Sequence, residues 1–211
     1  MRVDKVILRA FLSTLAAIVV LFAFMFAALS LIYPSTMMKL TYDLGMDSSS
    51  IRYATRAYDR TNDVYYIAYA TEVAIGLGDE EKIVTCGESF IADEEFADYC
   101  QAKNEQYVGN TEIEGSYEQY IYGVVCVSEY ALGNRTDAVE KAFGLIGDGY
   151  PVSNAAAAVL ATAIAAGDTA TIQTIGERLQ KIDRESLSSE EKAYLEKTIG
   201  WINGRMEGTS D

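Results

Sequence analysis

The first pattern along the chain is an uninterrupted apolar run near the N-terminus. From Ala10 to Tyr33, 24 residues pass without a charge, and a helix of that length exceeds the roughly 30 Å of a bilayer's hydrocarbon core. Three cations precede the run, as in a signal peptide, but signal peptides have apolar regions of only about 7–15 residues and a small-residue cleavage site. Leu and Ile crowd the end of this run. We therefore predict an uncleaved transmembrane helix over 10–33.

Beyond this run, apolar residues follow helical spacing, and four of the helical stretches end at a glycine. Glycine adopts the left-handed conformation that ends a helix at little cost, and a polar residue just beyond it can cap the next helix. The intervals between these glycines are 33, 55 and 34 residues, and the middle interval is one period plus 21 residues. The glycines are Gly45, Gly78, Gly133 and Gly167.

The residues around the glycines recur as well, which indicates a repeat of paired helices that bury their apolar faces against their neighbours. Nine positions after each glycine stands a small residue, which lets two helices approach closely: Ala54, Gly87, Ala142 and Gly176. Twelve positions after it are Ala57, Phe90, Leu145 and Leu179. We predict helices at 5–44, 49–61, 63–76, 79–91, 94–105, 116–132, 135–147, 154–166, 169–183 and 188–203.

The segment "ALGNRTDAVEKAFGLIGDGYP" (131–151) resembles the tetratricopeptide repeat. It has a glycine between its two helices (Gly133), an alanine five residues later (Ala138), and a proline near its end, at Pro151, one residue later than is usual. The other copies are degenerate, since Ile83 and Ile172 replace the alanine. The resemblance implies an α-α superhelix in which the first helix of each pair lines a concave face. A helical array without this ancestry is the alternative.

The predicted fold class is therefore all-α, with one N-terminal transmembrane helix followed by a tetratricopeptide-like array. The expected segments are a cytoplasmic N-terminus (1–9), the transmembrane helix (10–33), a membrane-proximal hairpin (34–61), a hairpin (62–93), an insertion (94–114), hairpins at 115–150 and 151–184, a C-terminal capping helix (188–204) and a tail (205–211).

Charge sets the expected orientation and limits the class of partner. Arg2, Lys5 and Arg9 precede the apolar run, whereas Lys39 is the only cation in the next 18 residues. The positive-inside rule then places the N-terminus in the cytoplasm and the rest of the chain outside the cell membrane. That remainder carries 14 cations and 30 acidic residues. Such an acidic domain argues against nucleic acid as a partner and against a domain that lies flat on anionic lipid.

No catalytic signature is present, and we expect neither an enzyme nor a bound cofactor or metal. The chain has no histidine, which excludes Ser-His and Cys-His pairs and histidine-containing zinc sites. An enzyme with a carboxylate-only site has no positive feature in its favour. The three cysteines are Cys86, Cys100 and Cys126. Two buried thiols are the simpler account of Cys86 and Cys100, and a disulfide between them is the alternative. Cys126 is expected to be a buried free thiol.

The 15 tyrosines are the most suggestive chemistry in the sequence. Tyrosine supplies rigid contact area with a polar tip, which suits recognition of a peptide or glycan. The resemblance implies a partner-binding concave face with Lys39, Tyr42, Tyr65, Glu72, Tyr120, Tyr130 and Asn154. We expect a non-catalytic protein that scaffolds a protein or peptide partner at the membrane. The alternative is a structural subunit of a membrane complex that interacts through its transmembrane helix, where Ala16, Ala23, Ala27 and Ser30 form a stripe of small residues.

Overall fold

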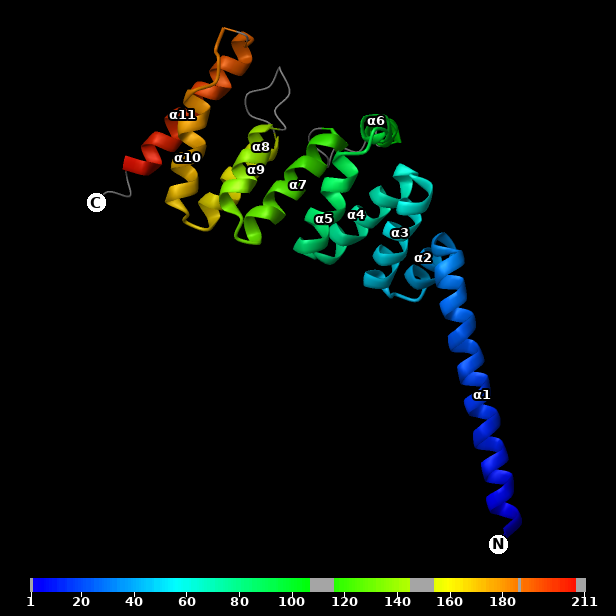
Figure 1. The fold of residues 1–211 in the computed structure, drawn as a ribbon. Coiled ribbons are helices and arrows are strands. Elements are labelled where there is room, and N and C mark those ends of the chain that lie inside the picture. The colour runs from blue at the N-terminus through cyan, green and yellow to red at the C-terminus, as the bar shows by residue number, and fades with distance from the viewer. Residues whose placement is uncertain (1, 107–115, 145–153, 186, 208–211) are drawn as a thin grey trace. The chain divides into compact units, whose positions relative to one another are not determined.

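The structure, a computed structural model, describes residues 2–106, 116–144, 154–185 and 187–207, and these residues form helices without any strand (Figure 1). The all-α prediction is thus confirmed for this part of the chain. Contacts divide the chain into two compact units, Met1–Ala70 and Thr71–Asp211, which are described separately below. The helices are α1 (Arg2–Ile32), α2 (Pro34–Asp43), α3 (Asp47–Thr61), α4 (Val64–Leu77), α5 (Glu80–Ile91), α6 (Phe96–Gln106), α7 (Tyr117–Ala131), α8 (Arg135–Gly144), α9 (Asn154–Ala165), α10 (Thr169–Gln180) and α11 (Ser189–Glu207).

Helix α1 carries the apolar run, and its part from Ile7 to Ile32 is long and apolar enough to cross a membrane. None of the most apolar stretch is buried inside the molecule. Length and composition of this kind are shared by membrane spans and by N-terminal signal sequences. The finding is therefore one N-terminal apolar helix of membrane-spanning length whose side chains have no partner within the chain.

The single helix expected over 5–44 is divided in two, which corrects the prediction. Tyr33 leaves the helical conformation, with φ −128° and ψ 66°, and α2 begins at Pro34. The cause is steric, because the proline ring disfavours the α conformation in the residue before it. Proline itself suits the first position of the new helix, where its missing N–H needs no partner. The first helix of the first pair is consequently α2 alone.

The four glycines each end a helix in the left-handed conformation, as predicted, with φ of 68° at Gly45, 64° at Gly78, 93° at Gly133 and 66° at Gly167. The same two backbone hydrogen bonds recur at every one. At Gly133 they run from its N–H to the Tyr130 oxygen (3.0 Å) and from the next N–H, of Asn134, to the Glu129 oxygen (3.2 Å). This is the Schellman motif. The next helix starts at once, and at two of the turns an aspartate caps it: Asp79 accepts from the Lys82 N–H and Asp168 from that of Thr171.

Helices α2 and α3 form an antiparallel pair around the core of the first unit. The buried residues include Met37 and Met38 on α2 and Ile51, Ala54 and Ala57 on α3, all at most 3% exposed. The spacing of these residues places them on one side of each helix, and the opposite sides carry polar and charged residues.

In the second unit, α7 is the central helix and packs against α5, α8 and α9, while α10 packs against α9 and α11. The small residue nine positions after each glycine does allow close approach. A Cβ atom added at Gly87 would lie 2.3 Å from Cγ2 of Val125 on α7, and one added at Gly176 would lie 3.1 Å from Cγ2 of Ile202 on α11. Leu145, from the same register, lies outside the described residues, as does Pro151.

The insertion contributes helix α6, which packs against α7. Its first residue, Phe96, meets Phe90 of α5 edge-on, with ring centroids 4.8 Å apart, and Tyr99 meets Phe90 in the same way at 5.4 Å. Residues 107–114 of the insertion lie outside the described part of the chain. At the far end, Ser188 and Glu191 form a capping box that starts α11, and Leu195 and Ile202 bury this helix against its neighbours.

Candidate binding surfaces

A tyrosine patch in the first unit contains two of the residues expected to bind a partner. We define the patch as Tyr42, Tyr65, Tyr66 and Tyr69. The ring of Tyr42, on α2, meets that of Tyr69, on α4, edge-on with centroids 5.8 Å apart, and Tyr65 lies 6.4 Å from Tyr69. Tyr42 is 53% exposed and Tyr65 46%. The structure therefore brings two exposed rings together over a third, half-buried one.

The hydroxyl of Tyr69 is buried and has no hydrogen-bond partner among the described residues. Burial raises the pKa of Tyr69, although the nearby Ser50 hydroxyl lowers it in part. Ser50 itself donates to the Asp47 carbonyl oxygen at 2.7 Å. Buried polar groups in proteins are nearly always paired, and an unpaired one costs about 1–3 kcal/mol. The patch thus holds a polar atom that a bound molecule can satisfy. The sequence contained no signal for this hydroxyl, because its isolation depends on what the fold places around it.

A second aromatic cluster lies in the second unit, around Glu72 and Lys103. The Tyr117 hydroxyl donates to Oε1 of Glu72 at 2.6 Å, and Nζ of Lys103 lies 2.9 Å from the same oxygen. Lys103 also sits over the rings of Tyr99 and Tyr117, at 5.6 and 5.8 Å from their centroids. Burial and the hydrogen bond to Glu72 raise the pKa of Tyr117. Glu72 therefore joins α4, α6 and α7, and its carboxylate is engaged inside the protein.

Two other expected site residues have different environments. Tyr120, on α7, is 45% exposed and its ring lies 6.3 Å from that of Tyr117. Tyr130 is only 6% exposed, and its hydroxyl donates to Oδ2 of Asp168 at 2.9 Å. Arg135 pairs with the same oxygen at 3.1 Å. Tyr130 consequently links the turn after α7 to the turn after α9. Asn154 begins α9, and its side chain lies outside the described residues.

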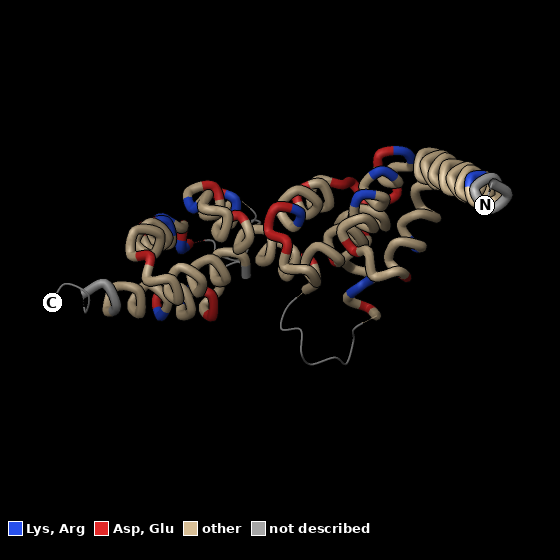
Figure 2. The backbone as a smooth tube through the Cα atoms, turned by 90° about the horizontal axis from the view of Figure 1, so that it is seen from below, with Lys and Arg blue, Asp and Glu red and all other residues tan. Residues whose placement is uncertain are grey.

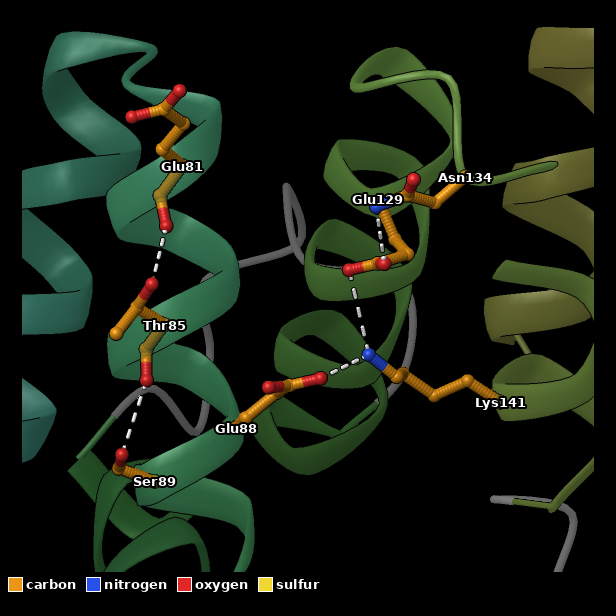
Figure 3. Close-up of polar contacts among 7 residues, drawn as sticks. All are labelled: Glu81, Thr85, Glu88, Ser89, Glu129, Asn134 and Lys141. Carbon is orange, nitrogen blue, oxygen red and sulfur yellow. Dashed lines mark hydrogen bonds and ion pairs between the residues drawn. The ribbon is translucent and has the colours of Figure 1, made fainter. Parts of the chain in front are cut away.

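A buried charge network that the sequence did not suggest links α5, α7 and α8 (Figure 3). Lys141 bonds the carboxylate of Glu88 and lies 3.5 Å from Oε2 of Glu129, whose other oxygen accepts from the Asn134 amide at 2.8 Å. Burial lowers the pKa of Lys141, but Glu88 and Glu129 outweigh that effect and the pKa is raised. The lysine therefore stays charged and holds three helices together. Figure 3 also shows Thr85 and Ser89 donating to backbone carbonyls of α5.

The three cysteines are free thiols, and all are buried. The alternative disulfide between Cys86 and Cys100 is thus not formed in the structure, and Cys126 is the buried thiol that was expected. Burial raises the pKa of Cys86 to about 11 and that of Cys100 to about 12. Among the described residues, no three Cys, Asp or Glu side chains are grouped as a metal site requires.

Comparison with known proteins found no matching family model, no matching curated protein and no matching solved structure. The class of protein rests on the chain itself. It is an all-α protein whose helices pack against their neighbours, preceded by one apolar helix of membrane-spanning length.

Proposed function

We propose that this protein is a single-pass membrane protein whose tetratricopeptide-like domain binds a protein or peptide partner outside the cytoplasm, without catalysing a reaction. The N-terminus is cytoplasmic in this proposal, and α1 is the anchor. Four Schellman turns at intervals of one period, with a small residue at the same register point after each, support the repeat. The three cations before the apolar run support the orientation.

The tyrosine patch is the observation that carries the binding proposal. Its exposed rings at Tyr42 and Tyr65 offer rigid apolar contact, and the unpaired hydroxyl of Tyr69 offers one hydrogen bond at the base of the patch. An extended peptide supplies both complements, since it has apolar side chains and a backbone amide or carbonyl at every residue. Anchoring in the membrane raises the local concentration of the site near a membrane-associated partner.

The test is a crosslinking pull-down of the intact protein from its own membrane, beside a version that lacks residues 1–33. We expect both forms to capture the same partner. The variant Tyr42→Ala/Tyr65→Ala should lose that partner while it remains folded by circular dichroism. Tyr194→Ala is the matched control, because Tyr194 is 47% exposed and lies on α11, outside the patch. Equal capture by the double variant and the control would refute the proposed site.

Tyr69→Phe is the sharper variant because it removes a single oxygen. The loss of one hydrogen bond to the partner should weaken binding roughly 2- to 12-fold. Stability should not fall, since the deleted hydroxyl is unpaired in the free protein. A stable variant with unchanged affinity would show that the partner does not use this atom.

The second candidate is a structural subunit that interacts through α1. It is favoured by the absence of any partner for the side chains of this helix within the chain. Replacing residues 10–33 by an unrelated apolar helix separates the two functions. Loss of the partner on replacement would support the subunit, and retention would support the patch. The mass of the protein extracted from the membrane tests the anchor itself, because a cleaved signal sequence would leave a chain shortened by about 30 residues.

A further inference from the structure

The α2–α3 hairpin differs in charge from the rest of the domain. Residues 34–62 hold four of the 14 cations that follow the apolar run but only three of the 30 acidic residues. Residues 63–211 hold the other ten cations and 27 acidic residues. The acidic average that argues against anionic lipid therefore does not apply to this hairpin. Figure 2, which colours cations blue and acidic residues red, allows the two distributions to be compared.

Three of these cations form one row on α3. Arg52, Arg56 and Arg60 are spaced four residues apart, so they lie on the same side of the helix, and all three are exposed. The row contains no acidic residue. None of the three arginines makes an ion pair with any residue that the structure describes. An unpaired basic row of this kind is unusual in a chain with a net charge of −14.

The row is held in place at both ends. The guanidinium groups of Arg52 and Arg56 lie over the ring of Tyr53, at 5.0 and 5.9 Å from its centroid, and Tyr53 is only 2% exposed. Nη1 of Arg60 donates to the carbonyl oxygen of Ile32, the last residue of α1, at 3.4 Å. The row consequently starts where the apolar helix ends.

We propose that this arginine row binds the phosphate groups of anionic membrane lipids, so that the α2–α3 hairpin lies against the membrane surface into which α1 inserts. The inference rests on the anchoring in the proposed function. If α1 spans the bilayer, its last residue is at the headgroup level, and Arg60 is bonded to it. Guanidinium groups match phosphate oxygens in pairs of hydrogen bonds. Acidic residues beyond a Debye length of about 8–10 Å are largely screened, so the local charge decides.

The hairpin also exposes apolar side chains suited to an interface between lipid and water. Leu40 and Leu44 lie four residues apart on one side of α2 and its last turn, and they are 43% and 64% exposed. Short amphipathic helices at membrane surfaces combine such residues with cations. Each arginine near an anionic surface contributes on the order of a fivefold preference for the docked state.

The experiment uses the full chain in vesicles that contain acyl-brominated lipid, which quenches tryptophan fluorescence on contact. One reporter is Ser48→Trp in a Trp201→Phe background, because Ser48 is exposed and continues the arginine row by one turn. A second reporter, Phe24→Trp, lies within the apolar helix. The vesicles contain either phosphatidylcholine alone or phosphatidylcholine with one third phosphatidylglycerol.

We expect the Ser48 reporter to be quenched more strongly in the anionic vesicles. Arg52→Gln/Arg56→Gln should reduce the ratio of docked to undocked hairpin on the order of 30-fold, and 1 M salt should act in the same direction. The control is Lys181→Gln/Lys197→Gln, which removes the same charge from exposed residues of the second unit and should change nothing.

Two results overturn the inference, and they are distinguishable. If the Phe24 reporter is quenched while the Ser48 reporter is equally unquenched in both kinds of vesicle, the anchor is correct and the arginine row faces water. An acidic protein would then be the occupant to test. If neither reporter is quenched, the anchoring fails and the inference fails with it.

Discussion

Replacing Gly87 by alanine tests the close approach of α5 and α7, the central packing feature of the second unit. The added Cβ would lie 2.3 Å from Cγ2 of Val125 and 3.7 Å from its Cβ. No side chain fits at that distance, so Val125 or the helices must shift, which typically costs about 1–3 kcal/mol. Alanine gains about 1 kcal/mol over glycine inside a helix. The net effect on the free energy of unfolding is thus between no change and a loss of about 2 kcal/mol.

Two other glycines separate the packing effect from the gain in helix propensity. An added Cβ meets nothing within 4 Å at Gly200, on α11, and meets Ile202 at 3.1 Å at Gly176, on α10. Gly200→Ala should therefore raise stability by about 1 kcal/mol. Gly176→Ala should fall between the other two. The difference between Gly200→Ala and Gly87→Ala should be about 1–3 kcal/mol.

The assay is urea unfolding of the full chain in detergent, followed by helical circular dichroism. A shift in midpoint at constant slope reports stability. Val125→Ala in the Gly87→Ala background should remove the overlap, so the two substitutions together should cost less than the sum of the separate costs. If Gly87→Ala stabilises the protein as much as Gly200→Ala does, the close contact between α5 and α7 is wrong.

Three further predictions concern single residues. Gly133→Ala should destabilise by about 1–2 kcal/mol, because φ at this position is 93°, whereas Gly144→Ala, at a helical position with open space around it, should not; equal unfolding midpoints would contradict the Schellman turn. The three thiols should resist alkylation at pH 8 until denaturant is added, because burial raises their pKa values to about 11 at Cys86 and about 12 at Cys100 and Cys126; rapid labelling of the native protein, measured by mass spectrometry, would show that they are accessible. Hydrogen bonds from Thr171 lower the pKa of Asp168, so its stabilising effect is complete above the ordinary carboxyl pKa of about 4 and lost as the pH falls through the lowered value. Asp168→Asn should therefore reduce the melting temperature at neutral pH, with a difference that disappears on acidification.

Much of the fold was predictable because its signals are local. The conformation of a residue such as Gly133 is determined by its own lack of a side chain, and the apolar run to Tyr33 is legible from composition alone. The break at Tyr33 was a local signal as well, since Pro34 disfavours a helical residue before it. That signal was given less weight than the long apolar pattern around it, and the continuous helix over 5–44 was wrong.

The binding surfaces were less predictable because exposure is a property of packing. Tyr42, Tyr65 and Tyr130 have the same side chain and share the first helices of their pairs, yet two are about half exposed and Tyr130 is buried against Asp168. The partner of Tyr130 lies 38 residues away in sequence, and no local pattern announces it.

The sequence by itself determined the helices, the glycine turns that separate them, the apolar helix and the register of small residues, because each depends on neighbours within about one helical turn. Only the tertiary structure decided which polar groups are satisfied. It pairs Lys141 with Glu88 and Glu129, commits Glu72 to Tyr117 and Lys103, and leaves the Tyr69 hydroxyl and the arginines of α3 without such partners. Those outcomes depend on which helices meet side by side, and the meeting is fixed by long-range packing.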